Sequence, residues 1–170
     1  MGKHQLVLAK ITEGYLNSLD LAIRSQVKKW LRLPMNTPDS YFYSCWWDGG
    51  IGLKCLWYVV PAMKLSRFRK ATWSEDPILK AIAASDWFQA EMRSCESGQM
   101  MKGMSMERRT ERDQAWSYEL HKTADGYGLT CASKVPFVHK WVVEGLRLML
   151  GHRYCAGIDL RGGVPPTRHR

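Results

Sequence analysis

Lysine and arginine form two clusters whose residue types and spacing suit one kind of chemistry, the binding of a phosphate backbone. The members of the two clusters are Arg24, Lys28, Lys29 and Arg32, and then Lys64, Arg67, Arg69 and Lys70. Like charges four residues apart on an isolated helix repel one another by about 0.2–0.5 kcal/mol per pair, and an adjacent polyanion would reverse that effect. These eight side chains are therefore predicted to contact nucleic acid. The alternative is a basic face that meets only solvent.

The overall charge of the 170-residue chain favours an anionic partner. Lysine and arginine number 25 against 16 aspartate and glutamate residues, which gives a formal net charge of +9. Such an excess steers a protein towards nucleic acid or an acidic surface. Phe68 and Trp73 lie beside the second cluster, where aromatic rings can stack on bases or sugars. Trp30 falls on an apolar helix face and is predicted to be buried, whereas burial and exposure are equally open for Trp46 and Trp47.

No catalytic set of residues is recognisable in the sequence. Its carboxylates do not stand together as a two-metal nucleotidyl-transfer site requires. The glycine turn at residues 49–52 lacks the Lys-Ser/Thr of a phosphate-binding P-loop. His152 and Cys155 share a helical spacing, but such a pair is far more often structural than half of a metal site. We therefore expect that this chain alone binds no metal or cofactor and lacks the residues for catalysis.

The cysteines and the apolar runs indicate an intracellular protein. The five cysteines are odd in number, and no two stand in a Cys-x-x-Cys spacing. This pattern argues against a disulfide framework and against a zinc site. The longest uncharged apolar run, residues 55–62, is far shorter than the ~20 residues of a membrane span. We expect a soluble protein of the cytoplasm or nucleus with no membrane partner.

Periodic apolar residues predict a mainly α-helical fold. Apolar side chains recur every three or four residues over 12–32, and Leu33-Pro34 should end that helix because proline disfavours helical geometry in the preceding residue. Thr37-Pro38 and Asp76-Pro77 each supply an N-cap followed by proline at the first helical position. The remaining predicted helices cover residues 38–43, 53–71 with a kink or break at Pro61, 78–84, 87–94, 105–121 as an exposed helix, 138–150 with Gly151 as C-cap, and 152–160.

Three segments are predicted to be irregular. Residues 98–103 are rich in methionine and glycine and are predicted to form a loop that serves as a linker. Residues 125–129 are predicted to form a turn that leads into a short strand, and residues 162–170 form a basic tail.

The run VKKWLRLPMNTP, residues 27–38, resembles one family closely. Pol proteins of the non-LTR retrotransposons that insert into ribosomal RNA genes, the type-1 "R-two" group, carry a form close to VRRWLRLPxDTP after their catalytic palm. The aromatic pair Tyr41-Phe42 and the glycine turn at 48–52 follow here as they do there. Further similarity is found at residues 4–8, 11–14, Pro61, Arg67, Arg69, 73–77 and 163–168. The likeness is dense over residues 4–80 and returns near the C-terminus.

This resemblance implies a function as part of a reverse transcriptase, an RNA-directed DNA polymerase. Residues 1–72 would form its helical thumb, 73–104 a helical connector and Met/Gly-rich loop, and 105–170 a linker that precedes a zinc knuckle. Nothing in the sequence matches the palm, the zinc knuckle or the endonuclease carboxylates, so Mg²⁺-dependent synthesis would belong to the parent polymerase. The implied partners are an RNA or RNA–DNA duplex and the remainder of the Pol protein.

The leading hypothesis is thus a fragment or decayed copy of such a Pol protein that retains duplex binding. Neutralising ~4–5 phosphates predicts a slope of about −4 when the logarithm of affinity is plotted against the logarithm of salt concentration. The alternative is a host-adopted helical module that uses its apolar stripe and tryptophans to bind a protein. A third possibility is a chain that does not fold by itself.

Overall fold

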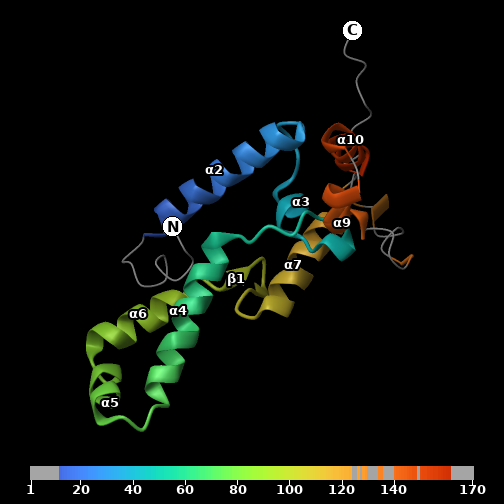
Figure 1. Cartoon of the computed structure of the whole chain (residues 1–170). Helices are drawn as coiled ribbons and strands as arrows, with labels where there is room; N and C mark the ends of the chain where they lie inside the picture. The colour runs from blue at the N-terminus through green and yellow to red at the C-terminus, as the bar shows by residue number, and fades with distance from the viewer. Residues whose placement is uncertain are drawn as a thin grey trace. The chain divides into compact units, whose positions relative to one another are not determined.

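A computed structural model of the chain describes residues 12–123, 126, 128–129, 134–135, 140–148 and 150–161 (Figure 1). Its helices are α2 (Glu13–Leu31), α3 (Asp39–Tyr43), the 3-10 helix η1 (Trp46–Asp48), α4 (Leu56–Thr72), α5 (Pro77–Ala83), α6 (Asp86–Ser97), α7 (Arg109–His121), α9 (Trp141–Leu148) and α10 (Gly151–Arg161). Two short strands, β1 (Met100–Met101) and β2 (Met104–Ser105), pair with each other. The prediction of a mainly α fold is confirmed. No helix in the described part of the chain is long and apolar enough to cross a membrane.

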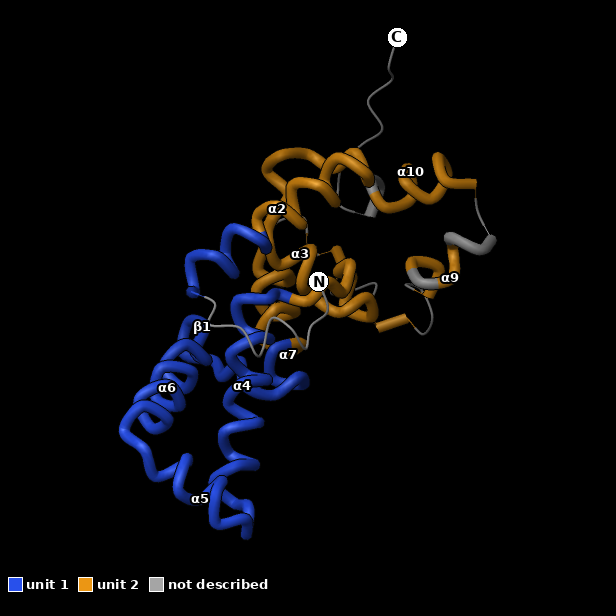
Figure 2. Tube along the Cα trace, turned by 60° about the vertical axis from the view of Figure 1, so that its left-hand side comes forward, with its two compact units in different colours: residues 1–20, 55–112 blue, residues 21–54, 113–170 orange. Residues whose placement is uncertain are grey.

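Contacts group the chain into two compact units, each built from two separate stretches of sequence (Figure 2). Unit 1 consists of Met1–Asp20 and Cys55–Arg112, and unit 2 consists of Leu21–Lys54 and Asp113–Arg170. The functional division into 1–72, 73–104 and 105–170 follows from the family resemblance and stays a prediction.

In unit 1, α4 is the helix against which the others pack. Phe68 of α4 meets Phe88 of α6 edge to face, with ring centroids 4.8 Å apart. Leu16 packs with Val60, and both are buried. Helix α4 begins at Leu56, later than predicted, and it runs through Pro61 without a break, so the predicted division there is wrong. The missing proline N–H removes one helical hydrogen bond, but the burial of Val60, Ala62 and Leu65 on either side holds the helix together.

The helix starts in the rest of unit 1 follow local sequence signals. The Asp76 carboxylate accepts the Ile78 N–H at 2.8 Å and Pro77 opens α5, as predicted. The predicted loop at 98–103 is instead partly a hairpin, in which Met101 pairs with Met104. Lys102 and Gly103 take positive φ angles of 48° and 84°, and two such residues in succession form the turn type that suits a two-residue hairpin.

In unit 2, the aromatic residues of α3 form the centre of the core. Phe42 is fully buried. The Tyr41 hydroxyl donates to the carbonyl oxygen of Ile158 in α10 at 3.3 Å. Tyr43 contacts Trp116 of α7 with a centroid separation of 4.8 Å. The prediction of an exposed helix is therefore wrong for this side of α7, where Ala115 and Leu120 are buried and Trp116 contacts Tyr43.

The glycine turn after α3 has a packing role. Gly49 has φ 102° and Gly52 has φ 82°, which are angles that glycine adopts readily. A Cβ atom on Gly50 would lie 2.2 Å from the Ser44 carbonyl oxygen, so no side chain fits there. The chain then returns beside α3, where the Ile51 N–H donates to the Tyr41 carbonyl at 2.9 Å.

Three further local predictions differ from the structure. Pro38, not Thr37, is the N-cap of α3, and the Thr37 hydroxyl donates to the Pro34 carbonyl at 2.8 Å. Gly151 is the first residue of α10 rather than the C-cap of α9. Gly128 and Leu129 are helical where a turn was predicted. The short strand and the tail at 162–170 lie outside the described residues.

Candidate nucleic-acid interface

Helix α2 follows its predicted apolar periodicity only in part: Leu16 is buried, but two charged residues are buried as well and Trp30 is exposed. Asp20 and Arg24, one helical turn apart, are only 3% and 9% exposed, whereas Trp30 is 68% exposed. The predicted burial of Trp30 is wrong. The inward positions are charged because both side chains find polar partners there, and a partnered charge can be buried where an unpartnered one cannot.

Arg24 links α2 to α3 within unit 2. Its guanidinium forms an ion pair with Asp39 in the first turn of α3. The same group lies 5.7 Å from the centroid of the Tyr43 ring, within range of a cation–π contact. A buried guanidinium engaged in this way positions α3 and has little surface left for an external phosphate.

Lys28 also makes contacts within unit 2, whereas Lys29 and Arg32 do not lie in the interior. Its ammonium donates to the Met35 carbonyl at 2.6 Å and lies 5.6 Å from the centroid of the Phe42 ring. Lys29 and Arg32 are exposed. The first cluster is therefore split: Arg24 and Lys28 hold the segment after α2, and Lys29 and Arg32 face solvent.

Arg32 ends α2 in an unusual backbone conformation. The Leu33 N–H donates to the Lys28 carbonyl at 2.9 Å, and the Arg32 N–H donates to the Lys29 carbonyl at 3.3 Å. This pair of bonds is a Schellman motif, and it places Arg32 in the left-handed region at φ 54°. Glycine is the usual residue at that position, since other residues are less stable there by about 1–2 kcal/mol.

The second cluster is likewise divided between internal and external side chains. Arg69 forms ion pairs with Glu107 and, at 3.3 Å, with Glu96, and its hydrogen bond with Glu107 raises the pKa of the guanidinium. Lys64 lies 3.9 Å from the Glu91 carboxylate. Arg67 is half-buried, and Lys70 is exposed near the end of α4.

The aromatic residues proposed for stacking are also separated by the fold. Phe68 packs against Phe88 inside unit 1, so its ring belongs to the core and is not presented for stacking. Trp73, which follows Lys70 by three residues, is 82% exposed. Trp46 and Trp47 stack on each other with centroids 3.6 Å apart, and Trp47 remains 61% exposed.

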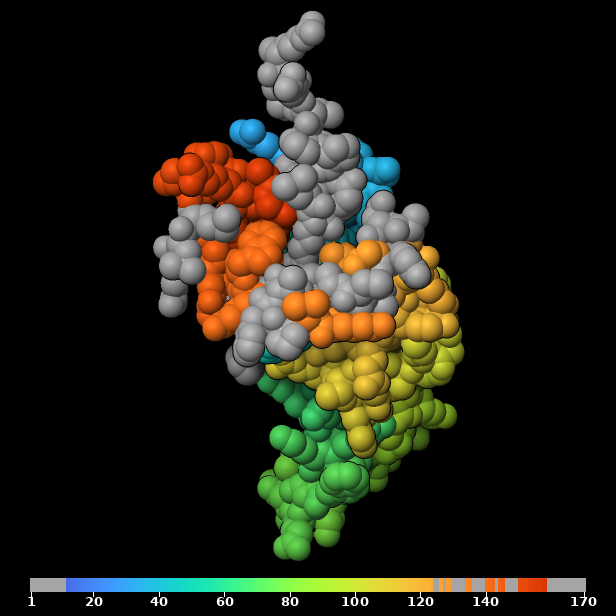
Figure 3. Space-filling view, turned by 90° about the vertical axis from the view of Figure 1, so that its right-hand side faces the viewer, coloured from blue at the N-terminus to red at the C-terminus, as the bar shows by residue number. Residues whose placement is uncertain are grey.

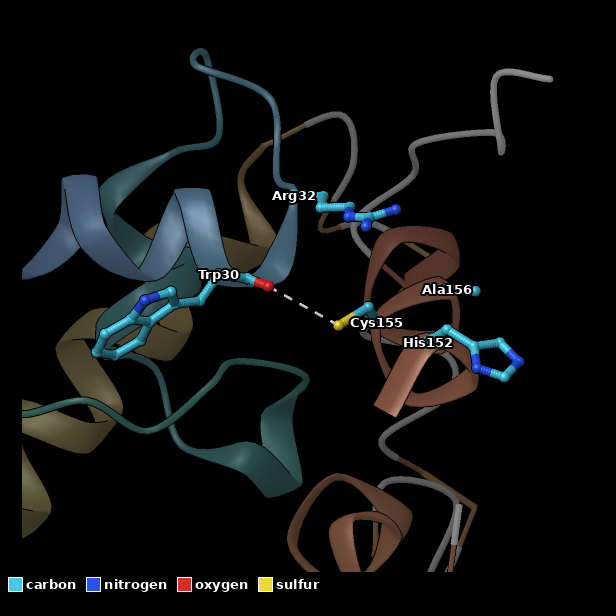
Figure 4. A pocket seen from close by; sticks show the side chains of 5 residues that line it. All are labelled: Trp30, Arg32, His152, Cys155 and Ala156. Atoms are coloured by element: carbon cyan, nitrogen blue, oxygen red, sulfur yellow. Dashed lines mark hydrogen bonds between the residues drawn. The ribbon is translucent and has the colours of Figure 1, made fainter. Parts of the chain in front are cut away.

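A pocket in unit 2 lies between the end of α2 and the first half of α10. It has a volume of about 270 Å³ and is lined by Trp30, Arg32, His152, Cys155 and Ala156. The Cys155 thiol lies 3.8 Å from the Trp30 carbonyl oxygen, which faces it (Figure 4). In that view the Trp30 indole points away from α10, whereas the Arg32 side chain extends towards α10. The sequence analysis did not select His152 as a site residue. Trp30 and Arg32, with which it lines the pocket, lie more than a hundred positions earlier, and no local pattern indicates that they come together.

Within the described residues, no three histidine, cysteine, aspartate or glutamate side chains gather in a way that could hold a metal ion. The most perturbed thiol is that of Cys55, whose pKa is raised to about 12 by burial and by the neighbouring Asp20 carboxylate. This thiol donates to Asp20 at 3.4 Å and stays protonated at neutral pH, which makes it a structural group rather than a nucleophile.

The geometry therefore defines a mainly α, basic protein with cations and aromatic rings on its surface and no assembled metal centre in its described part. No known family model matches the sequence. The chain is nevertheless 29% identical, over 98% of its length, to the Retrovirus-related Pol polyprotein from type-2 retrotransposable element R2DM of Drosophila melanogaster.

Pol polyproteins from type-1 retrotransposable elements named R2 give similar matches. Identity is 28% over 82% of this chain for the protein of Nasonia vitripennis, and 29% over 98% for that of Bradysia coprophila. The resemblance to R2 retrotransposon Pol proteins is thus confirmed, and it extends well beyond the segment that carries the motifs. The chain spans 16%, 12% and 19% of the lengths of these three relatives.

Proposed function

We propose that the chain serves as the thumb and linker portion of a non-LTR retrotransposon reverse transcriptase and contacts the template–primer duplex. The similarity over 98% of the chain to an R2-type Pol polyprotein is the observation that carries this proposal. In the proposal, 1–72 is the thumb, 73–104 the connector and 105–170 the linker. It acts in the cytoplasm or nucleus beside a palm that supplies Mg²⁺-dependent polymerisation.

The exposed cations are the preferred phosphate contacts. Lys29, Arg32 and Lys70 are exposed, so each can reach a phosphate without breaking an internal contact. Arg24 and Arg69 would have to leave carboxylate partners first. In this proposal the buried members of the two clusters shape the surface, and the exposed members bind.

The salt dependence of duplex binding tests the proposal. Three neutralised phosphates give a log–log slope of about −3, and the wider set of residues predicted from sequence gives about −4. We would titrate the full chain with a fluorescent RNA–DNA duplex between about 50 and 200 mM salt. Binding that does not change over this range would overturn the proposal.

Charge reversal localises the binding. The double variant Lys29→Glu and Arg32→Glu should lower affinity steeply, because it replaces two attractive contacts with two repulsive ones. Lys29→Glu alone is compared with the matched control Lys80→Glu, since each reverses one charge and Lys80 is an exposed cation on α5 outside both clusters. Equal losses in both variants would indicate a diffuse effect of net charge rather than a defined surface.

A second function, the binding of a protein, is favoured by exposed apolar side chains in unit 1. The members of this apolar surface are Trp73, Ile78, Leu79, Ile82 and Trp87. The green segment that spans α4 and α5 lies at the surface in the space-filling view (Figure 3). Exposed apolar patches are typical of interaction sites, and these five exposed side chains lie within one short stretch of the chain. A double variant Ile78→Ser and Ile82→Ser should abolish capture of a protein partner while sparing duplex binding, and the opposite pattern would exclude this function.

A further inference from the structure

The end of α2 places an arginine where the backbone favours glycine. Arg32 occupies the left-handed position of a Schellman motif, with φ 54°. Non-glycine residues in such conformations persist where the surrounding structure holds them, and they gather at functional sites. An arginine at a position where glycine is the usual residue therefore indicates that its side chain has a role that glycine could not fill.

The side chain of Arg32 is directed to a pocket. Arg32 and His152 both line the cavity between α2 and α10, and both are exposed. In Figure 4 the Arg32 guanidinium and the His152 ring extend to the same side, away from the Trp30 indole. The two residues come from helices that are distant in sequence, and the contact between Cys155 and the Trp30 carbonyl joins those helices at this point.

The size and lining of the pocket select the class of ligand. About 270 Å³ is less than the 300–1,000 Å³ typical of sites for whole small molecules. The indole that could stack on a base points away. A guanidinium presents a planar fork of donors that matches phosphate oxygens, and an imidazole N–H adds another donor. His152 lies in the first turn of the 11-residue helix α10, whose positive end also favours an anion.

We propose that Arg32 and His152 together bind one phosphate of a nucleic-acid chain in this pocket. The inference rests on the proposed function, and it names a specific anchor within that function. Arg32 would make the bidentate contact and His152 would add a further donor, and the left-handed φ of Arg32 at the end of the Schellman motif fixes where the arginine side chain leaves the backbone.

Replacement of Arg32 by glycine separates binding from folding. Arg32→Gly removes the guanidinium and relieves the positive φ, so it should raise the melting temperature and still weaken duplex binding. One lost phosphate contact should lower the magnitude of the log–log salt slope by about 1 and weaken binding about fivefold at 0.15 M salt. His152→Gln should weaken binding by a smaller factor.

Lys102→Gly is the matched control. Lys102 is the other described non-glycine residue with positive φ, and it lies in the hairpin turn of unit 1. The change removes the same charge and relieves the same kind of strain, and it should leave the salt slope unchanged. A slope change equal to that of Arg32→Gly would overturn the inference.

The probe is a short RNA–DNA duplex prepared with 5′-phosphate ends and with 5′-hydroxyl ends. Loss of affinity in Arg32→Gly for both duplexes assigns the pocket to an internal phosphodiester, and loss only with 5′-phosphate assigns it to a terminal phosphate. Wild-type binding that Arg32→Gly leaves unchanged overturns this inference alone. An absence of wild-type binding to either duplex overturns both it and the proposed function.

Discussion

The Asp20 carboxylate accepts the backbone N–H of Leu56 at 2.9 Å, so a residue of α2 caps the start of α4. Its other oxygen accepts the Trp57 N–H, also at 2.9 Å. Cys55, the N-cap residue in sequence, supplies no side-chain cap of its own. The first turn of a helix leaves backbone N–H groups without helical partners, and here a side chain more than thirty positions away satisfies two of them.

Removal of this cap should destabilise the protein. Asp20→Ala leaves three donors without this acceptor, the N–H groups of half-buried Leu56 and Trp57 and the buried Cys55 thiol, and we expect the free energy of unfolding to fall by about 1–3 kcal/mol. Urea denaturation followed by circular dichroism measures the change. Asn17→Ala, an exposed substitution on the same helix, should stay within about 0.5 kcal/mol of wild type. A small loss for Asp20→Ala would show that water replaces the cap.

Substitutions in the first basic cluster should separate stability from binding. Arg24→Ala removes the ion pair with Asp39 and should lower the free energy of unfolding by about 1–3 kcal/mol. Lys29→Ala should leave stability within about 0.5 kcal/mol and reduce duplex affinity. Thermal melting and fluorescence anisotropy on the same samples give the two quantities. The reverse pattern would mean that Arg24 leaves Asp39 to bind phosphate.

The buried Cys55 thiol should make stability fall at high pH. Its pKa is about 12 in the folded chain, against an ordinary value of 9.0. Between these values the unfolded chain loses the proton and the folded chain keeps it, so rising pH favours unfolding. We expect a loss of about 1.4 kcal/mol per pH unit from this group. Urea titrations at about pH 8 and pH 11 should show a shallower decline in Cys55→Ser, which has no titrating thiol. Identical declines would contradict the assignment.

Trp73 should contribute to binding of single-stranded nucleic acid through its exposed ring. Its 82% exposure leaves an indole face free beside the end of α4. Loss of one base–aromatic stack typically weakens binding by about 1–3 kcal/mol, so Trp73→Ala should reduce affinity for an RNA oligonucleotide by that amount. Trp73→Phe should retain most of the affinity. Equal losses for both, or for neither, would argue that Trp73 serves the apolar surface of unit 1 instead.

Gly50 should tolerate no side chain. A Cβ atom would lie 2.2 Å from the Ser44 carbonyl oxygen, and that backbone cannot shift without disturbing buried α3. We expect Gly50→Ala to destabilise the protein by about 1–3 kcal/mol. Gly14→Ala is the control, since a Cβ there meets nothing within 4 Å. A melting temperature for Gly50→Ala that matches the control would show that the turn rearranges freely.

The sequence by itself determined part of the local structure and the family resemblance. Apolar periodicity located α2, Asp76-Pro77 located the start of α5, and the run at 27–38 indicated the resemblance to retrotransposon Pol proteins. These signals are readable because each arises from residues within a few positions of one another, as helical turns, caps and motifs do.

Only the tertiary structure decided which basic side chains are available to bind an external phosphate. Arg24 and Lys29 look alike in sequence, yet Arg24 is buried against Asp39 and Lys29 meets solvent. Trp30 is exposed where burial was predicted, and Asp20 is buried because its carboxylate caps the start of α4. That Arg32 and His152 line one pocket likewise depends on a contact between distant segments, Cys155 with the Trp30 carbonyl. Burial of a charge depends on a partner supplied by another segment, and the spacing of residues within one helix carries no information about that partner.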